Sequence, residues 1–164
     1  MENKLKAKYH EVTEIKSLKD MLEQSVRRYP DRPAFLVKKE KGGEYFPITY
    51  AQAGSDIDAL GTKLIALGLK DAKIALIGEN CYEWAASYFA VVNGAGVAVP
   101  LDKELRRDEI LNLIRQADCR AVFFTESFEE YFRDSEIEYK IRMKFYGDRT
   151  GHSEPLKQLS GSGA

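Results

Sequence analysis

The stretch from Lys73 to Asp102 reads KIALIGENCYEWAASYFAVVNGAGVAVPLD. It begins with a short apolar run at Lys73–Ile77 and closes with another at Val97–Pro100. The segment between them, Cys81–Asn93, is apolar on almost every side of a helix. This order predicts a strand, a buried helix and a second strand. Because such a unit needs a crossover connection, the two strands should run parallel.

The composition of this unit also predicts how it is buried. Continuous apolar runs are typical of strands that are covered on both faces, so we expect both strands to be buried. A helix without a polar face should be buried as well. Its expected packing residues are Trp84, Tyr88, Phe89, Val91 and Val92.

A helix and a hairpin are expected near the N-terminus. Ser17 is a suitable N-cap for a helix that ends near Tyr29. Strands at Ala34–Val37 and Tyr45–Ile48 should pair as an antiparallel hairpin, because the charged, glycine-containing segment Lys38–Glu44 is typical of a turn.

The segment after the hairpin has the strongest helix signals. Thr49 and Gln52 fit a capping box, and Gly68 is suited to end the helix in a left-handed conformation. Apolar residues at helical spacing predict its buried face: Ala53, Ile57, Leu60, Leu64 and Leu67.

Further helices and strands are expected after Asp102. A helix at Arg106–Ala117 should bury Ile110, Leu113, Ile114 and Ala117. A third parallel strand, a short helix with Thr125 as N-cap and a last strand follow at Ala121–Phe124, Glu126–Arg133 and Ile141–Phe145.

The expected fold is therefore α/β, a layered parallel sheet with flanking helices plus a small antiparallel hairpin. We expect residues 1–16 to form an N-terminal arm and residues 17–146 the α/β subdomain. Residues 147–164, which end in SGSGA, have the composition of a flexible tail or a truncation.

Composition excludes several classes of function. The chain has 164 residues and a formal net charge of -1, so nothing favours binding to nucleic acid or to an anionic membrane. Cys81 and Cys119 are too few for a disulfide framework or a zinc site. The polar N-terminus lacks the apolar core of a signal peptide, and no apolar run is long enough to span a bilayer. A cytoplasmic protein is expected.

Two glycine-containing segments are candidates for ligand loops. Asn93–Gly96 lies between a helix and a strand and lacks the third glycine of a dinucleotide fingerprint, so a helix end and tight turn are expected. Gly78–Cys81 follows a strand, as do Pro100–Asp102 and Thr125. Ligands of open α/β sheets bind at such strand ends, so these loops should line any crevice.

The same loops contain polar residues with simpler roles. Asn80 is expected to be the N-cap of the buried helix. Cys81 could have a lowered pKa at a helix N-terminus, but no histidine follows nearby to activate it as a nucleophile.

Other titratable residues predict no site. His10 and His152 are isolated in the two polar terminal regions. The acidic pairs Glu129-Glu130 and Asp108-Glu109 are expected to be solvated helix faces, and the basic pairs Arg27-Arg28 and Arg106-Arg107 are too short for a nucleic-acid patch. Residue chemistry alone thus predicts no catalytic, cofactor-binding or metal-binding residue.

The order of several segments resembles the N-terminal part of the AMP-forming acyl-CoA synthetases. That superfamily also contains nonribosomal peptide adenylation domains and firefly luciferase. The similar segments are Ile48–Tyr50 before a long helix, Lys73–Asn80, Glu83-Trp84, Val92–Asp102, the helix and strand from Glu109 to Phe123, and the opening helix within Ser17–Arg32. Arg106 departs from the family pattern, in which a small polar residue often caps the following helix.

The resemblance implies an enzyme that activates a carboxylic acid with ATP and Mg²⁺ to an acyl-adenylate, which CoA then converts to a thioester. The pattern E-N-x-x-E-W at Glu79–Trp84 is most similar to long-chain fatty-acid–CoA ligases. The phosphate loop of the family, a Ser/Thr/Gly-rich stretch before a lysine, does not occur in this sequence, so no catalytic or nucleotide-binding residue is carried over. We therefore expect an N-terminal fragment that is inactive alone.

Two alternatives remain open. One is a free-standing, non-catalytic binding or scaffold module of the same fold. The other is a fragment of an amino-acid or aryl-acid adenylation domain. A fragment that lacks its neighbouring parts is expected to self-associate into a dimer or a larger homo-oligomer through exposed apolar surface.

Overall fold

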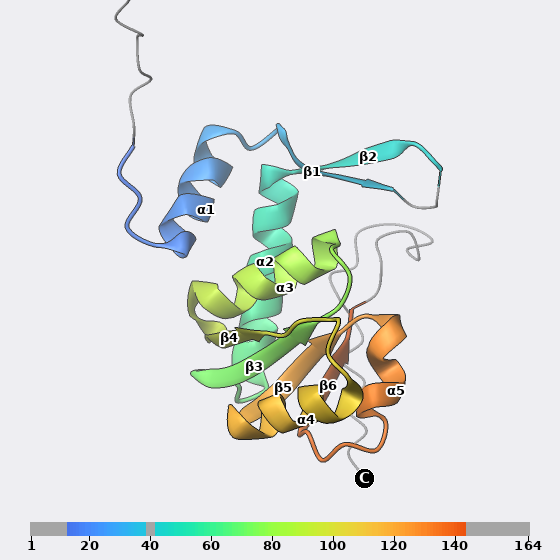
Figure 1. The fold of residues 1–164 in the computed structure, drawn as a ribbon. Helices are drawn as coiled ribbons and strands as arrows, with labels where there is room; N and C mark the ends of the chain where they lie inside the picture. The colour runs from blue at the N-terminus through green and yellow to red at the C-terminus, as the bar shows by residue number, and fades with distance from the viewer. Residues whose placement is uncertain (1–12, 39–41, 144–164) are drawn as a thin grey trace, which may run out of the picture.

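The computed structural model describes residues 13–38 and 42–143 (Figure 1). Strands and helices alternate along most of this part of the chain. In order they are α1 (Leu18–Arg28), β1 (Pro33–Lys38), β2 (Tyr45–Thr49), α2 (Tyr50–Ala66), β3 (Ala72–Ile77), α3 (Tyr82–Ala90), a π-helical turn (Val91–Ala95), β4 (Gly96–Pro100), α4 (Arg107–Gln116), β5 (Cys119–Phe124), a 3-10 turn (Glu126–Phe128), α5 (Glu129–Phe132) and β6 (Tyr139–Arg142).

The central sheet has four parallel strands in the order β4-β3-β5-β6. Ile74 of β3 pairs with Ala98 on one side and with Ala121 on the other. β1 and β2 form a separate antiparallel pair, in which Phe35 lies opposite Ile48. The predicted α/β class, the parallel strands and the hairpin are confirmed.

The two faces of the central sheet bury different side chains because residues alternate along each strand. Ile74 and Leu76 face a core that contains residues of α2 and α3. Ala75 and Ile77 face a second core that contains residues of α4 and α5. Figure 1 shows α2 and α3 on one side of the sheet and α4 on the other.

The predicted signals of α2 are confirmed. The Thr49 side chain accepts a hydrogen bond from the backbone N–H of Gln52 at 3.2 Å, and Gln52 Oε1 accepts one from the backbone N–H of Thr49 at 2.9 Å. At the other end Gly68 has a φ of 75°, a conformation that glycine adopts without strain. Leu67, expected in the buried stripe, is the C-cap and is half-buried.

Gly96 allows β4 to approach β3 closely. A Cβ atom at this position would lie 2.3 Å from the backbone oxygen of Ala72. The glycine therefore serves the backbone contact where the two strands begin to pair. Together with Gly94, whose φ is 133°, it makes Asn93–Gly96 the expected helix end and turn rather than a phosphate loop.

The expectation that β4 is covered on both faces is wrong. The strand pairs with β3 alone among the described residues, and Val97 is 54% exposed. Its apolar composition matches that of β3, but β3 is central in the sheet and β4 lies at its edge. Sequence periodicity carries no information on this difference.

α3 is also less buried than expected. Tyr82 and the small residues Ala86 and Ala90 reach the core and are almost fully buried. Trp84, Tyr88, Phe89 and Val92, which were expected to be its packing residues, are half-buried, whereas Val91 is fully buried. Trp84, Tyr88 and Phe89 thus lie at the margin of the core, whereas Tyr82 lies within it.

Two smaller predictions need correction. Leu113 of α4 is 37% exposed, because Ile110 and Ile114 face the sheet and Leu113 lies to one side of them. β6 begins at Tyr139, before the predicted Ile141, and residues 144–145 lie outside the described residues.

Several predictions fall on residues that the structure does not describe. They concern His10, His152, residues 1–12 of the arm, residues 39–41 of the hairpin turn and the tail 147–164. Within residues 13–38 and 42–143, no helix is long and apolar enough to cross a membrane.

Candidate functional site

The carboxyl ends of the parallel strands bring together the loops singled out in the sequence. The loop after β3 contacts the loop after β5 directly, through Glu79 and Thr125. The loop after β4 begins beside β3, where the backbone N–H of Leu101 donates to the backbone oxygen of Leu76 at 2.9 Å. The expectation that all three loops line a ligand crevice stays a prediction.

Glu79 is the centre of the polar contacts at this edge. Its carboxylate accepts hydrogen bonds from the hydroxyl of Thr125 and from the hydroxyl of Ser127. Thr125 is fully buried, whereas Glu79 is half-buried and Ser127 is exposed. One carboxylate therefore holds both hydroxyls of the β5 loop.

The ionised form of Glu79 is favoured. Burial acts to raise its pKa, but the hydrogen bonds from Ser127 and Thr125 and the positive charge of Lys103 outweigh burial, so the pKa lies below the ordinary value. A carboxylate that stays ionised near neutral pH is an acceptor and a charge, and it is poorly suited to act as a general acid.

Gly78 explains how the two loops come so close. Its φ is 154°, and a Cβ atom there would lie 2.5 Å from Cγ2 of Thr125. A side chain at this position would push the β5 loop away from Glu79. Because Gly78 has no side chain, it allows the loops after β3 and β5 to touch. The sequence alone indicated this glycine only as the end of a strand.

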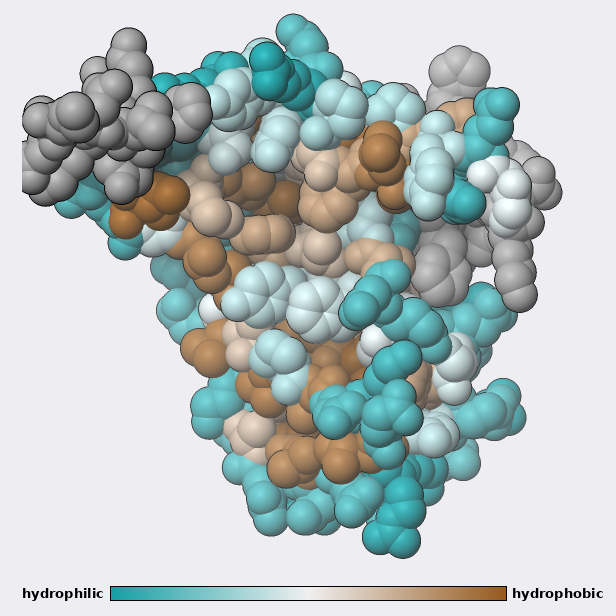
Figure 2. Space-filling view, turned by 45° about the horizontal axis from the view of Figure 1, so that its top comes forward, coloured by the Kyte–Doolittle hydropathy of each residue, from teal (hydrophilic) through white to brown (hydrophobic). Residues whose placement is uncertain are grey.

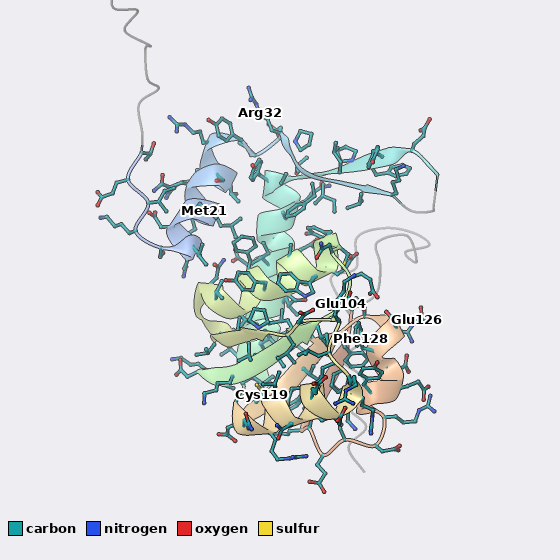
Figure 3. All side chains as sticks on the ribbon, viewed as in Figure 1. Met21, Arg32, Glu104, Cys119, Glu126 and Phe128 are labelled. Carbon is teal, nitrogen blue, oxygen red and sulfur yellow. The ribbon has the colours of Figure 1, made fainter. Side chains whose placement is uncertain are left out.

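Arg142 ties the end of β6 to the helical segment after β5. Its guanidinium donates to Glu129 and to Glu126, both at 2.8 Å. Its Nε is buried without a hydrogen-bond partner within the described part of the chain. The pair Glu129-Glu130 was expected to be fully solvated, but Glu129 is half-buried and bound to Arg142. Figure 3 shows Glu126 at this end of the sheet.

The start of α3 differs from the prediction. Cys81, not Asn80, is the N-cap, and its Sγ accepts a hydrogen bond from the backbone N–H of Trp84 at 3.4 Å. Burial raises the pKa of the Cys81 thiol to about 11, and the nearby charge of Glu83 adds to this rise. The suggestion of a lowered pKa at this helix N-terminus is wrong, because burial dominates.

The remaining charged pairs have structural partners or lie in solvent. Arg106 contacts Asp108 and Glu109, and Arg107 donates to the backbone oxygen of Tyr131 at 3.2 Å. The backbone N–H of Arg106 donates to Glu109 at 2.9 Å, so the glutamate caps α4 although no small polar residue precedes it. In the part of the chain that the structure describes, no group of three or more His, Cys, Asp or Glu residues could hold a metal ion.

A separate hollow of about 510 Å³ lies at the amino end of the sheet, away from the loops described above. Cys119, at the start of β5, lies on its wall together with Asp118 and Ile137. Figure 3 places Cys119 at the end of the sheet opposite Glu126. Burial raises the pKa of Cys119, so the thiol is not activated there.

The sequence indicates the loops but not the side-chain contacts between them. Glu79 was expected only as part of the loop Gly78–Cys81, and neither Ser127 nor Arg142 was predicted to lie at the site. A usable signal exists, because Glu79 and Ser127 are polar residues two and three positions after the ends of the neighbouring buried strands β3 and β5. The hydrogen bonds of Glu79 with Thr125 and Ser127 hold the two adjacent loops together, and those of Arg142 with Glu126 and Glu129 tie β6 to the segment after β5.

Comparisons with known proteins find similar sequences and similar folds within longer chains. A family model described as "AMP-binding enzyme" matches residues 22–159. The "Putative acyl-CoA synthetase YngI" of Bacillus subtilis (strain 168) is 30% identical over 109 residues, which are 66% of this chain and 19% of that protein. "Long chain acyl-CoA synthetase 1" of Arabidopsis thaliana is 23% identical over 148 residues, which are 88% of this chain and 22% of that protein.

A solved structure of similar fold is the N-terminal domain of FACL13 from Mycobacterium tuberculosis. The TM-score is 0.68 at 20% sequence identity, covering 78% of this chain and 34% of that one. The chain thus spans about a fifth of the length of the curated relatives it matches.

Proposed function

Because this chain belongs to the AMP-binding enzyme family, we propose that it supplies the N-terminal part of an acid–thiol ligase that activates a carboxylic acid with ATP and transfers the acyl group to CoA. The match of the family model to residues 22–159 is the observation that carries this proposal. The two acyl-CoA synthetases that match the chain support the same reaction class.

Within such an enzyme, the described residues would act mainly by positioning. Glu79, Thr125 and Ser127 hold together two loops at the carboxyl edge of the sheet, where ligands of open α/β folds bind. Within the described part of the chain, no group of three or more His, Cys, Asp or Glu residues could hold a metal ion by itself. We assign the groups that bind ATP, Mg²⁺ and CoA to parts of the enzyme other than this chain.

The proposed substrate is a long-chain fatty acid. The segment Glu79–Trp84 supports this assignment through its similarity to long-chain fatty-acid–CoA ligases. The name of the Arabidopsis relative is consistent with it. The cytoplasmic location expected from the sequence belongs to the same proposal.

The test compares the 164-residue chain with the protein encoded by the complete reading frame. Each is incubated with ATP, Mg²⁺, CoA and either octanoate, palmitate or benzoate, and pyrophosphate and the acyl-CoA product are measured. We expect the complete protein to form palmitoyl-CoA fastest and the 164-residue chain to release no pyrophosphate.

Each part of the proposal can fail separately. A complete protein that forms no thioester with any acid would overturn the reaction class. A preference for benzoate would overturn only the fatty-acid assignment. Pyrophosphate release by the 164-residue chain would show that it contains a nucleotide site, against the assignment of that site to other parts of the enzyme.

A further inference from the structure

Two arginines and a tyrosine form an exposed group at the end of α1, which we call the arginine cluster: Arg28, Tyr29 and Arg32. The guanidinium carbons of Arg28 and Arg32 lie 5.9 Å and 5.3 Å from the centroid of the Tyr29 ring. All three residues are exposed, and Figure 3 shows Arg32 at the outer end of the molecule. Figure 2 shows hydrophilic residues along the upper rim of the face that it presents. Two positive charges are therefore held on one ring at the protein surface.

The backbone of the cluster is fixed by the start of α2. The N–H of Arg32 donates to the oxygen of Tyr29, and the oxygen of Arg32 accepts from the N–H of Tyr50, both at 3.0 Å. The N–H of Ala51 donates to the oxygen of Pro30, also at 3.0 Å. The rings of Tyr29 and Tyr50 form an aromatic pair with centroids 6.4 Å apart. The turn that carries Arg32 is thus part of the packed fold, which defines where its side chain begins.

No carboxylate neutralises Arg28 or Arg32 within residues 13–38 and 42–143. In that part of the chain neither arginine forms an ion pair, not even with the neighbouring Asp31, and Arg28 makes one long hydrogen bond to the hydroxyl of Thr13 at 3.3 Å. Four other arginines form ion pairs with glutamates: Arg106, Arg120, Arg133 and Arg142. The arginine cluster therefore carries positive charge that the described residues leave uncompensated.

The dipole of α1 explains only part of this arrangement. Arg28 lies in the last turn of the helix, where the free carbonyl groups favour a positive charge. Arg32 comes after the C-cap Tyr29, and the effect of the dipole falls off within the last turn. A second cation beside the first is unfavourable without an anion, because like charges repel. The pair thus favours binding of an anion from outside the chain.

Phosphate is the anion that suits two neighbouring arginines. A guanidinium group presents several N–H donors in one plane and forms paired hydrogen bonds with phosphate oxygens. A phosphate monoester carries between one and two negative charges at neutral pH, and its oxygens can accept from two guanidinium groups at once. A carboxylate has a single charge and two oxygens, which one guanidinium group already satisfies.

We propose that the arginine cluster binds a phosphoryl group, with Arg28 and Arg32 as the donors and the Tyr29 ring holding both guanidinium groups in place. The site lies at the end of α1, away from the loops after β3 and β5, and it is additional to the proposed ligase reaction. The phosphoryl group is that of a free phosphate or of an anionic lipid headgroup, because both offer the same oxygens and charge.

Equilibrium dialysis of the complete protein against radiolabelled inorganic phosphate, at constant ionic strength, tests for the free ion. We expect a site that Arg28→Gln and Arg32→Gln each weaken about tenfold, because each substitution removes charge-assisted hydrogen bonds. Arg115→Gln is the matched control and should leave binding unchanged, since Arg115 is an exposed arginine in the last turn of α4. Tyr29→Phe should keep the affinity because it keeps the ring, whereas Tyr29→Leu should lower it.

Co-sedimentation with lipid vesicles distinguishes the two sources of the phosphoryl group. Vesicles of phosphatidylglycerol mixed with phosphatidylcholine are compared with vesicles of phosphatidylcholine alone. Phosphate binding in dialysis without sedimentation would assign the site to a free phosphate. Sedimentation with the anionic vesicles that Arg28→Gln and Arg32→Gln reduce, and Arg115→Gln does not, would assign it to a lipid headgroup. Either result supports the site.

Three results would overturn the inference. They are the absence of binding in both experiments, equal losses for Arg115→Gln and the two cluster variants, and wild-type affinity in Tyr29→Leu. The first shows that no site exists, the second that attraction is unspecific, and the third that the ring does not hold the arginines. A complete protein that binds phosphate through Arg28 and Arg32 but forms no acyl-CoA would keep this site and overturn only the proposed function.

Discussion

The carboxylate of Glu79, just after β3, accepts a hydrogen bond from the buried hydroxyl of Thr125, just after β5. The two residues lie 46 positions apart in the chain, and neighbouring parallel strands bring them together. Because Thr125 is fully buried, its hydroxyl depends on a protein acceptor. This contact therefore links the two loops at the carboxyl end of the sheet.

Replacing Thr125 by valine should destabilise the protein. The substitution keeps the shape of the side chain and removes a hydrogen bond to a charged group, so we expect a loss of about 1–2 kcal/mol in the free energy of unfolding. Urea unfolding followed by circular dichroism measures it. Ser127→Ala is the matched control, because water can replace the exposed hydroxyl, and its cost should stay below about 0.5 kcal/mol. Equal costs for the two variants would contradict the role of Thr125.

Glu79 should make stability depend on pH in the acid range. Its pKa in the folded protein lies below the ordinary value of 4.5, so the folded state favours the ionised form. The resulting stabilisation is complete well above pH 4.5 and is lost as the pH falls through the lower folded-state pKa. We expect the difference in unfolding free energy between the wild type and Glu79→Gln to be largest near pH 7 and to shrink below about pH 4.5.

Chemical unfolding of both proteins at a series of pH values measures this difference. Because Glu79→Gln shares every other titrating group with the wild type, their contributions cancel. A difference that grows on acidification would mean that the folded state raises the pKa of Glu79, contrary to its hydrogen bonds with Ser127 and Thr125.

Gly78→Ala should cost more than about 2 kcal/mol, because the new Cβ would combine an unfavourable φ with a clash against Thr125. Gly68→Ala is the control. Gly68 also has a positive φ, but its Cβ would meet no atom within 4 Å, so the expected cost is about 1 kcal/mol.

A double-mutant cycle can isolate the clash between Gly78 and Thr125. Thr125→Ala removes the atoms nearest to the new Cβ, so Gly78→Ala should cost less in that background than in the wild type. Additive costs would show that backbone strain alone determines the effect.

Cys81 should react slowly with alkylating agents. Its pKa of about 11 leaves little thiolate at pH 8, so we expect alkylation by iodoacetamide to be about tenfold or more slower than that of a free cysteine peptide. The rate should continue to rise through pH 10. Mass spectrometry of a Cys119→Ser variant follows Cys81 alone, and the same variant in urea serves as the unfolded control. Fast alkylation with a plateau below pH 8 would be evidence for an activated thiol.

Local patterns in the sequence were sufficient for most elements of the fold. The capping box of Thr49 and Gln52, the C-terminal glycine at Gly68 and the apolar runs of β3 and β5 all act within a few residues. Such signals rest on hydrogen bonds between nearby backbone groups and on the spacing of apolar side chains. Both depend only on residues that are close together in the sequence. The position of these loops at the carboxyl end of the sheet could also be predicted from the sequence, because parallel strands all end on the same side of a sheet.

The contacts between these loops could not be predicted in the same way. Glu79 meets Thr125 and Ser127 only because β5 lies beside β3, a pairing of distant segments that periodicity does not encode. The choice of Cys81 over Asn80 as N-cap depends on the path of a single loop, and the raised pKa of Cys81 depends on the burial that follows.

The sequence by itself thus determined the alternation of strands and helices, the N-caps of α1 and α2 and the parallel direction of the strands, because these follow from local bonding and from the length of the connections. Only the tertiary structure decided which apolar segments are covered. Val97 and Phe89 of α3 are as apolar as the buried residues of β3, yet Val97 is 54% exposed and Phe89 is only half-buried. Burial depends on position among all the packed elements, and hydrophobicity alone does not fix that position.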